Sequence, residues 1–211
     1  MKKGKILALA GVALLATGVL AACSNSTSNS SNSSSSGADQ VFNYIYEVDP
    51  ENLNYLISSK AATTDLTANL IDGLLENDNY GNLVPSMAED WTVSKDGLTY
   101  TYTLRKDAKW FTSDGEEYAD VKAQDFVAGL KYAADNKSET LYLVQSSIKG
   151  LDDYVNGKTK DFSSVGVKAV DDHTVQYTLN EPESFWNSKT TMGILYPVNE
   201  EFLKSKGDKF A

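Results

Sequence analysis

The chain has 211 residues, and its 19 basic and 29 acidic side chains give a formal net charge of −10. An acidic protein is repelled by nucleic-acid phosphates, and no basic cluster with interleaved aromatic residues occurs, so nucleic-acid binding is disfavoured. The single cysteine excludes an internal disulfide and a cysteine-based metal site.

The first 22 residues are typical of a secretory signal peptide. Lys2, Lys3 and Lys5 precede an apolar run over residues 6–20 that is too short for a comfortable membrane-spanning helix. The sequence then reads Leu-Ala-Ala-Cys23, which resembles the bacterial lipobox, where the cysteine receives a lipid and becomes the new amino terminus. We expect Cys23 to anchor the protein to the outer face of the cell membrane, as in Gram-positive bacteria. The alternative is an ordinary signal peptide with a chance cysteine.

Residues 23–37 are predicted to form a lipidated, disordered tether. After Cys23 the segment contains only Ser, Asn, Thr and a closing Gly37, so it has no apolar surface to bury. As a flexible coil it would reach roughly 20 Å. The tether would therefore hold a folded body clear of the membrane.

The folded body is predicted to begin with a strand over residues 41–48, which are rich in aromatic and β-branched residues. A helix is expected from Thr63 or Thr64, because Leu66, Leu70, Ile71 and Leu74 recur at helical spacing, with Gly73 near its end. Residues 79–82 form a turn.

Two hairpins follow from turn signals between alternating strands. The first pairs residues 91–93 with 98–104, and Leu98, Tyr100, Tyr102 and Leu104 are expected to share its buried face. The second pairs residues 165–170 with 174–179, and His173 lies in its turn.

Helical patterns cover four further stretches. The apolar spacing predicts helices over residues 123–134 and 140–148, and a short one ending at Gly157. The last covers residues 200–206, with Asn199 as its N-cap and Gly207 as its C-terminal stop.

Several of these segments together resemble the signature of the peptide/nickel-type (family 5) solute-binding proteins of ABC importers, in particular oligopeptide-binding lipoproteins of the streptococcal type. The motifs are IDGLL at 71–75, GNLVPSMAEDW at 81–91, DGLTYTYTLR at 96–105, AKW at 108–110, DG at 114–115, AQDFV at 123–127 and GVKAVDDHTV at 166–175. The resemblance runs from about residue 41 to residue 211.

The resemblance implies an α/β, periplasmic-binding-protein-like fold of class II, in which two lobes close on a ligand and an extra domain is inserted. Only its N-terminal portion is expected here, because family members are longer. Residues 38–71 would begin lobe I, residues 72–181 would form the inserted α/β domain, and residues 182–211 would return to lobe I. The resemblance also implies a monomer without a cofactor.

The function that the resemblance implies is capture of oligopeptides and their delivery to the permease subunits of an ABC transporter. Family members hold the peptide backbone by strand-like hydrogen bonds. Such a site would include Ser58, Ser59, Lys60 and Ala61, with Tyr142 as a floor or wall. An ordinary surface loop is the alternative for each of these residues, and residues 38–211 alone are expected to bind little peptide.

Other functions remain as alternatives. The same fold can serve an extracellular peptide (pheromone) sensor. An extracytoplasmic hydrolase is less favoured, because the only histidine, His173, is expected in a turn and no nucleophile motif is present. A metal site is disfavoured by the lack of further His, Cys or clustered Met.

One residue departs from the family pattern. The family has Thr where Lys122 precedes Ala-Gln-Asp, so the usual hydroxyl cap is missing from the helix at residue 123. We expect Asp120 to substitute.

Overall fold

The computed structural model describes residues 43, 45 and 48–209. The signal peptide, Cys23, the tether and most of the strand expected at 41–48 lie outside the described residues. Of that strand, Asn43, Ile45 and Val48 are described, and none is in a strand. Residues 45–211 belong to one compact unit, and none of its described helices is long and apolar enough to cross a membrane.

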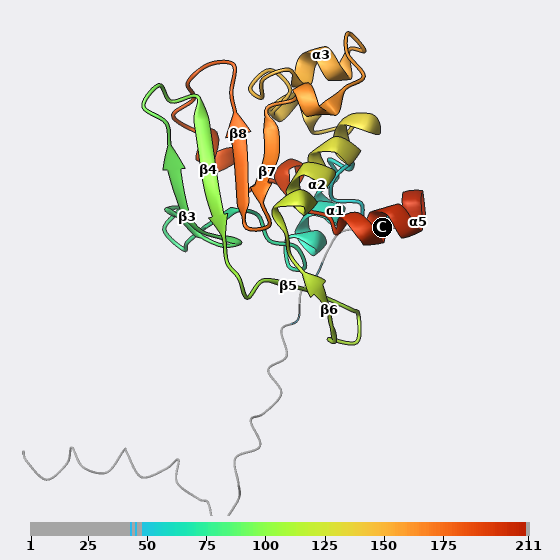
Figure 1. Cartoon of the computed structure of the whole chain (residues 1–211). Coiled ribbons are helices and arrows are strands. Elements are labelled where there is room, and N and C mark those ends of the chain that lie inside the picture. Colours follow the sequence, from blue (N-terminus) through green and yellow to red (C-terminus); the bar gives the residue numbers. More distant parts are fainter. Residues whose placement is uncertain (1–42, 44, 46–47, 210–211) are drawn as a thin grey trace, which may run out of the picture. The chain divides into compact units, whose positions relative to one another are not determined.

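An antiparallel sheet of four strands forms the centre of this unit (Figure 1). Its strands are β3 (Ala88–Val93), β4 (Thr99–Leu104), β8 (Thr174–Thr178) and β7 (Val167–Asp171), in that order across the sheet. Both predicted hairpins are confirmed, and β4 of the first pairs with β8 of the second, with Tyr100 opposite Tyr177. Tyr100, Tyr102 and Leu104 are buried as the alternation predicts, whereas Leu98, just before β4, is half-buried.

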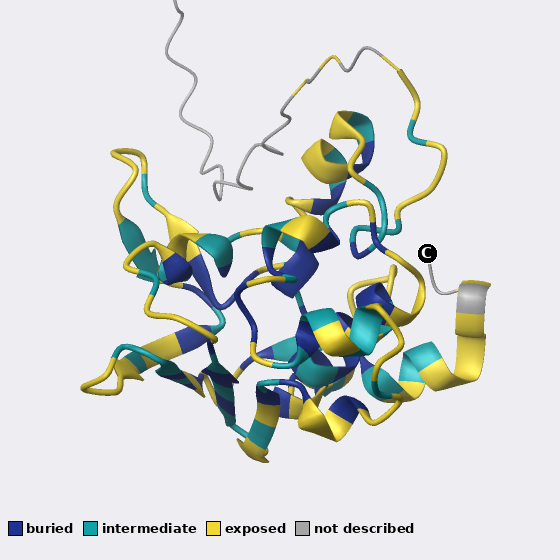
Figure 2. Cartoon of the chain, turned by 90° about the horizontal axis from the view of Figure 1, so that it is seen from above, coloured by how far each residue is buried: buried dark blue, intermediate teal, exposed yellow. Residues whose placement is uncertain are grey.

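The helix α2 (Ala123–Asp135) packs against β7 and β8, as Figure 1 shows. Its buried face includes Phe126 and Leu130, in agreement with the predicted amphipathic pattern. A second element, α4 (Trp186–Lys189), inserts Trp186 against Tyr100 and Tyr177, with ring centroids 6.1 and 5.4 Å apart. Figure 2 shows the buried residues gathered in the interior of this body.

Two small hairpins were not predicted. One joins β1 (Leu75–Asn77) and β2 (Leu83–Pro85) around the predicted turn, where the Asp78 carboxylate accepts the backbone N–H groups of Tyr80 and Asn82. The other joins β5 (Lys109–Phe111) and β6 (Glu117–Asp120). Three-residue strands carry too few positions for an alternation to be recognised.

Short helices occupy the rest of the described chain. Two predictions are confirmed, since α3 (Leu151–Val155) stops before Gly157 and α5 (Glu200–Lys206) is capped by Asn199 Oδ1, which accepts the N–H of Phe202 at 2.8 Å. The others are α1 (Ala61–Thr67) and the 3₁₀ turns η1 (Leu141–Leu143), η2 (Phe162–Ser164), η3 (Gly193–Leu195) and η4 (Gly207–Lys209).

The predicted start and buried face of α1 are wrong. The helix begins at Ala61, and neither Thr63 nor Thr64 is its N-cap. Its buried side chains are Thr63 and Thr67, whose hydroxyls donate to the carbonyls of Asn52 and Thr63, whereas Leu70 is 68% exposed beyond the helix end. Hydroxyls that bond to main-chain carbonyls can be buried without leaving an unsatisfied polar group.

The helix predicted over residues 140–148 is also wrong. Only the 3₁₀ turn η1 forms, because Ile148 makes an isolated bridge to Leu179 and the next residue, Lys149, donates its N–H to the Thr178 carbonyl at 3.0 Å. Because residues 148 and 149 pair with residues 178 and 179, they cannot continue a helix.

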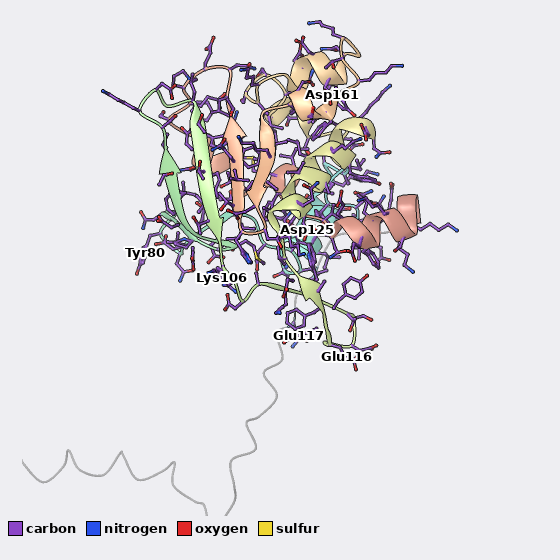
Figure 3. The ribbon with its side chains drawn as sticks, viewed as in Figure 1. Tyr80, Lys106, Glu116, Glu117, Asp125 and Asp161 are labelled. Carbon is purple, nitrogen blue, oxygen red and sulfur yellow. The ribbon has the colours of Figure 1, made fainter. Side chains whose placement is uncertain are left out.

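Asp125, and not Asp120, caps α2. Asp125 Oδ2 accepts the N–H of Lys122 at 3.1 Å, while Asp120 forms an ion pair with Lys109. Asp125 also accepts Trp110 Nε1 at 2.8 Å and the N–H of Glu200 at 3.1 Å, so it ties α2 to β5 and α5 (Figure 3). Burial raises the pKa of this carboxyl. The prediction of Asp120 failed because the N–H of Asp125, which an N-cap hydroxyl would accept, donates to the Lys122 carbonyl at 3.0 Å, and the Asp120 carboxylate is engaged by Lys109.

Candidate functional site

Two cavities flank α1 and share Tyr55 and Thr67 as walls. The larger groove has a volume of about 830 Å³ and the smaller cavity about 330 Å³. The smaller cavity is lined by Tyr55, Ser58, Thr64, Thr67, Ala68, Thr140, Leu143, Thr191, Met192, Gly193, Ile194 and Tyr196. Three separate stretches of sequence, 55–68, 140–143 and 191–196, therefore meet around it.

The predicted site loop, residues 58–61, lies beside the smaller cavity. Ser58 is half-buried and lines it, whereas Ser59, Lys60 and Ala61 are exposed and are not among its lining residues. Lys60 pairs with Glu51, Nζ to Oε2 at 2.6 Å. Of the four loop residues, the structure brings only Ser58 to a cavity wall.

Glu139 holds this loop, although the sequence did not point to it. Its Oε2 accepts both the N–H and the hydroxyl of Ser59, each at 2.8 Å, and its own N–H donates to the Ile57 carbonyl at 3.0 Å. The two hydrogen bonds from Ser59 hold the pKa of Glu139 below its usual value. A contact between residues 80 apart in sequence leaves no local pattern, so only the fold could show it.

Tyr142, the predicted floor or wall, is 71% exposed on η1 and is not a lining residue of either cavity. Its neighbours Thr140 and Leu143 line the smaller cavity instead. The predicted position was therefore near the cavity wall, but the structure does not place the tyrosine ring there.

The larger groove has an aromatic wall, contributed by Trp110 and Phe111 of β5, Tyr118 of β6 and Phe202 of α5. Tyr118 and Phe202 make an edge-on contact with ring centroids 6.2 Å apart. Glu116 lies at the tip of the β5–β6 hairpin, and Glu117 begins β6 (Figure 3). Among the lining residues of this groove only Glu51 is charged.

Neither cavity carries a recognisable catalytic arrangement. His173 lies in the β7–β8 turn, as predicted, with its N–H on Asp171 Oδ1, and it lines neither cavity. Within residues 48–209, no group of three or more His, Cys, Asp or Glu side chains is arranged to hold a metal ion.

Comparisons with known proteins give a consistent result. The model of the bacterial extracellular solute-binding proteins, family 5, matches residues 82–211. The oligopeptide-binding protein AliA of Streptococcus pneumoniae is 72% identical over the whole chain, which spans 31% of that relative. The chain thus covers about a third of the length of such relatives.

Solved structures agree on the fold. OppA of Listeria monocytogenes, bound to peptide, has a TM-score of 0.67 and 31% identity, covering 74% of this chain and 30% of that one. OppA of Haemophilus influenzae, in complex with the peptide RPPGFSPFR, has a TM-score of 0.68 and 29% identity, covering 76% and 31%. The expected periplasmic-binding-protein type of fold is confirmed over the part that these structures cover.

Proposed function

Because this chain belongs to the bacterial extracellular solute-binding proteins of family 5, we propose that its full-length protein captures oligopeptides outside the cytoplasm and delivers them to an ABC importer. The relatives named above are oligopeptide-binding proteins, and two solved structures of the same fold hold peptides. Since the chain spans about a third of AliA, the activity of the whole protein is inferred from this membership.

The structural observation that supports peptide capture is the clamp between Glu139 and Ser59. It fixes the backbone of the loop before α1 next to a cavity of about 330 Å³, which lies within the range of about 300–1,000 Å³ common for small-ligand sites. A loop that is already held in place by Glu139 loses little entropy when a ligand docks, which favours affinity.

Calorimetric titration of the full-length protein with a pool of short oligopeptides tests this proposal. We expect saturable heat with peptides and none with nickel. Heat with nickel and silence with peptides would overturn peptide capture. Mass spectrometry of the peptides after incubation should show them intact, because the proposed protein is a binding protein and not a hydrolase.

We further propose that Cys23 carries a lipid that anchors the protein to the outer face of the cell membrane, and that the protein is a monomer. Export with a lipid anchor would keep the binding protein close to its transporter, where its effective concentration is high. Feeding cells an alkyne-tagged fatty acid should label the protein, and Cys23→Ser should abolish the label. Labelling of the variant would refute the site.

The domain boundaries also stay a proposal, with residues 38–71 beginning lobe I, residues 72–181 inserted as an α/β domain, and residues 182–211 returning to lobe I. All four strands of the main sheet lie between residues 88 and 178, within the proposed inserted domain, which supports it. Limited proteolysis of the full-length protein should cut first near residues 72 and 182 if the inserted domain is a separate unit.

A further inference from the structure

We propose that the smaller cavity is a side-chain subsite of the peptide site and that it selects an uncharged, apolar side chain; this inference rests on the proposed function. The cavity is defined above by its twelve lining residues, and it is formed by described residues alone. Its preference follows from what those residues expose to a ligand.

The lining contains many hydroxyls, yet most of them are already used inside the protein. Five of these hydroxyls donate to main-chain carbonyls. The Thr140 hydroxyl makes a hydrogen bond of 3.1 Å with the Ser138 hydroxyl, and Ser58 Oγ accepts the N–H of Lys60 at 3.2 Å. The donors, with their acceptor carbonyls, are Tyr55 to Pro197, Thr64 to Lys60, Thr67 to Thr63, Thr191 to Ser188, and Tyr196 to Thr191. A wall whose hydroxyl protons point into the protein offers few new hydrogen bonds to a ligand.

Apolar groups complete the wall. Ala68 follows α1, Leu143 comes from η1, and Met192 and Ile194 come from the segment around η3. Met192 is 39% exposed, and its flexible thioether chain can adapt to side chains of different shape. Burying an aliphatic side chain of leucine size in such a site gains about 1.5–3 kcal/mol when burial is complete.

Charge is absent from this lining, which contains no Asp, Glu, Lys or Arg. Three charged residues close to the lining along the chain are engaged elsewhere: Lys60 pairs with Glu51, Glu139 accepts the N–H and the hydroxyl of Ser59, and Lys189 pairs with Glu183. A charged ligand side chain would lose hydration here without gaining a counter-charge, which is unfavourable. The cavity therefore discriminates against charge as well as favouring apolar surface.

The methionines provide a direct test on the full chain. There are three, Met1, Met87 and Met192, and of these only Met192 lines the cavity. With methyl-labelled methionine, N-acetyl-leucinamide should shift the Met192 signal saturably in the millimolar range and leave Met87 unchanged. N-acetyl-lysinamide and N-acetyl-glutamic acid amide at the same concentrations should shift neither signal.

Ala68 allows a matched pair of variants, because its backbone is helical and its side chain is exposed at the cavity wall. Ala68→Leu should fill the cavity and abolish the leucinamide shift, whereas Asn69→Leu, one residue away and not in the lining, should retain it. With Ala68→Glu, N-acetyl-lysinamide should begin to shift the Met192 signal, though weakly, since an exposed ion pair contributes modestly.

Equal Met192 shifts with charged and apolar amides, or leucinamide binding that survives Ala68→Leu, would overturn the subsite. This failure is distinct from failure of the proposed function. If the full-length protein binds oligopeptides but shows no apolar preference, only the subsite is refuted. If leucinamide binds at Met192 and no oligopeptide binds the full-length protein, peptide capture is refuted.

Discussion

The four-stranded sheet and the α1 region bury different kinds of side chain. On the sheet, Tyr102, Tyr177 and Trp186 are fully buried and their rings contact one another or a neighbouring ring. In the α1 region the buried side chains of the helix are threonines, while the apolar Leu53 and Leu70 are 41% and 68% exposed. The aromatic side chains of the sheet region cover one another, whereas the α1 region leaves Leu53, Leu70 and the two cavities accessible to a ligand or partner.

The largest effect is expected where the sheet core is densest. Trp186→Ala should lower the free energy of unfolding by about 3–5 kcal/mol, because it removes a fully buried ring that contacts Tyr100 and Tyr177. Urea denaturation measures this from the shift in midpoint at unchanged slope.

Phe185→Ala is the matched control, because the adjacent ring is 57% exposed and contacts Lys189 through its face. It should cost less than about 1 kcal/mol. If Trp186→Ala and Phe185→Ala lower the free energy of unfolding by similar amounts, Trp186 is not the densely packed centre of the sheet core.

The difference between the two regions also explains how far sequence reasoning reached. Both long hairpins and α2 were predictable, because turn residues such as Gly97 (φ +72°) and alternating or helical apolar spacing are local signals. The pairing of β4 with β8 joins segments about 75 residues apart and could only come from the family resemblance or the fold.

The candidate site was predicted less well. The sequence indicated the loop before α1, but the loop position that lines a cavity is Ser58 alone, and the Tyr142 ring lies outside both cavities. Glu139, Thr140 and Met192 were missed because no local pattern marks them as site residues, and their roles arise only when three distant stretches meet.

The second largest effect is expected at Asp125, which joins the sheet region to the wall of the larger groove. Asp125→Ala should cost roughly 2–3 kcal/mol, because it leaves the partly buried N–H donors of Lys122, Glu200 and the Trp110 ring without their acceptor. Asp135→Ala, at the exposed other end of α2, should cost less than about 1 kcal/mol. Equal losses measured by urea denaturation would refute the role of Asp125.

A smaller change in stability, whose sign tests the prediction, is expected at Gly129, where α2 packs against the main chain of Tyr196, a lining residue of the smaller cavity. Alanine normally favours a helix interior by about 1 kcal/mol over glycine. Here a Cβ would lie 2.5 Å from the main-chain oxygen of Tyr196, so Gly129→Ala should instead destabilise the protein by about 1–2 kcal/mol. A stabilised variant in thermal denaturation would show that this close approach is absent.

The smallest effect is expected in the α1 region, at the hydrogen bonds between Glu139 and Ser59. The hydrogen bonds from the Ser59 N–H and hydroxyl hold the pKa of Glu139 below its usual value of 4.5. Because the folded-state pKa is the lower one, the stabilisation is fully present above pH 4.5 and is lost as the pH falls through the folded-state pKa.

The ¹H shift of the Ser59 amide should therefore follow a titration whose midpoint lies below pH 4.5, since this proton bonds directly to the carboxylate. Glu139→Gln should remove that titration while leaving global stability nearly unchanged, because the clamp is exposed and ties only a loop. Glu116→Gln, on the tip of the β5–β6 hairpin, should leave the profile as it is (Figure 3). If Glu139→Gln leaves the Ser59 titration unchanged, Glu139 does not hold the loop beside the smaller cavity. The argument for peptide capture that rests on this clamp would then fail.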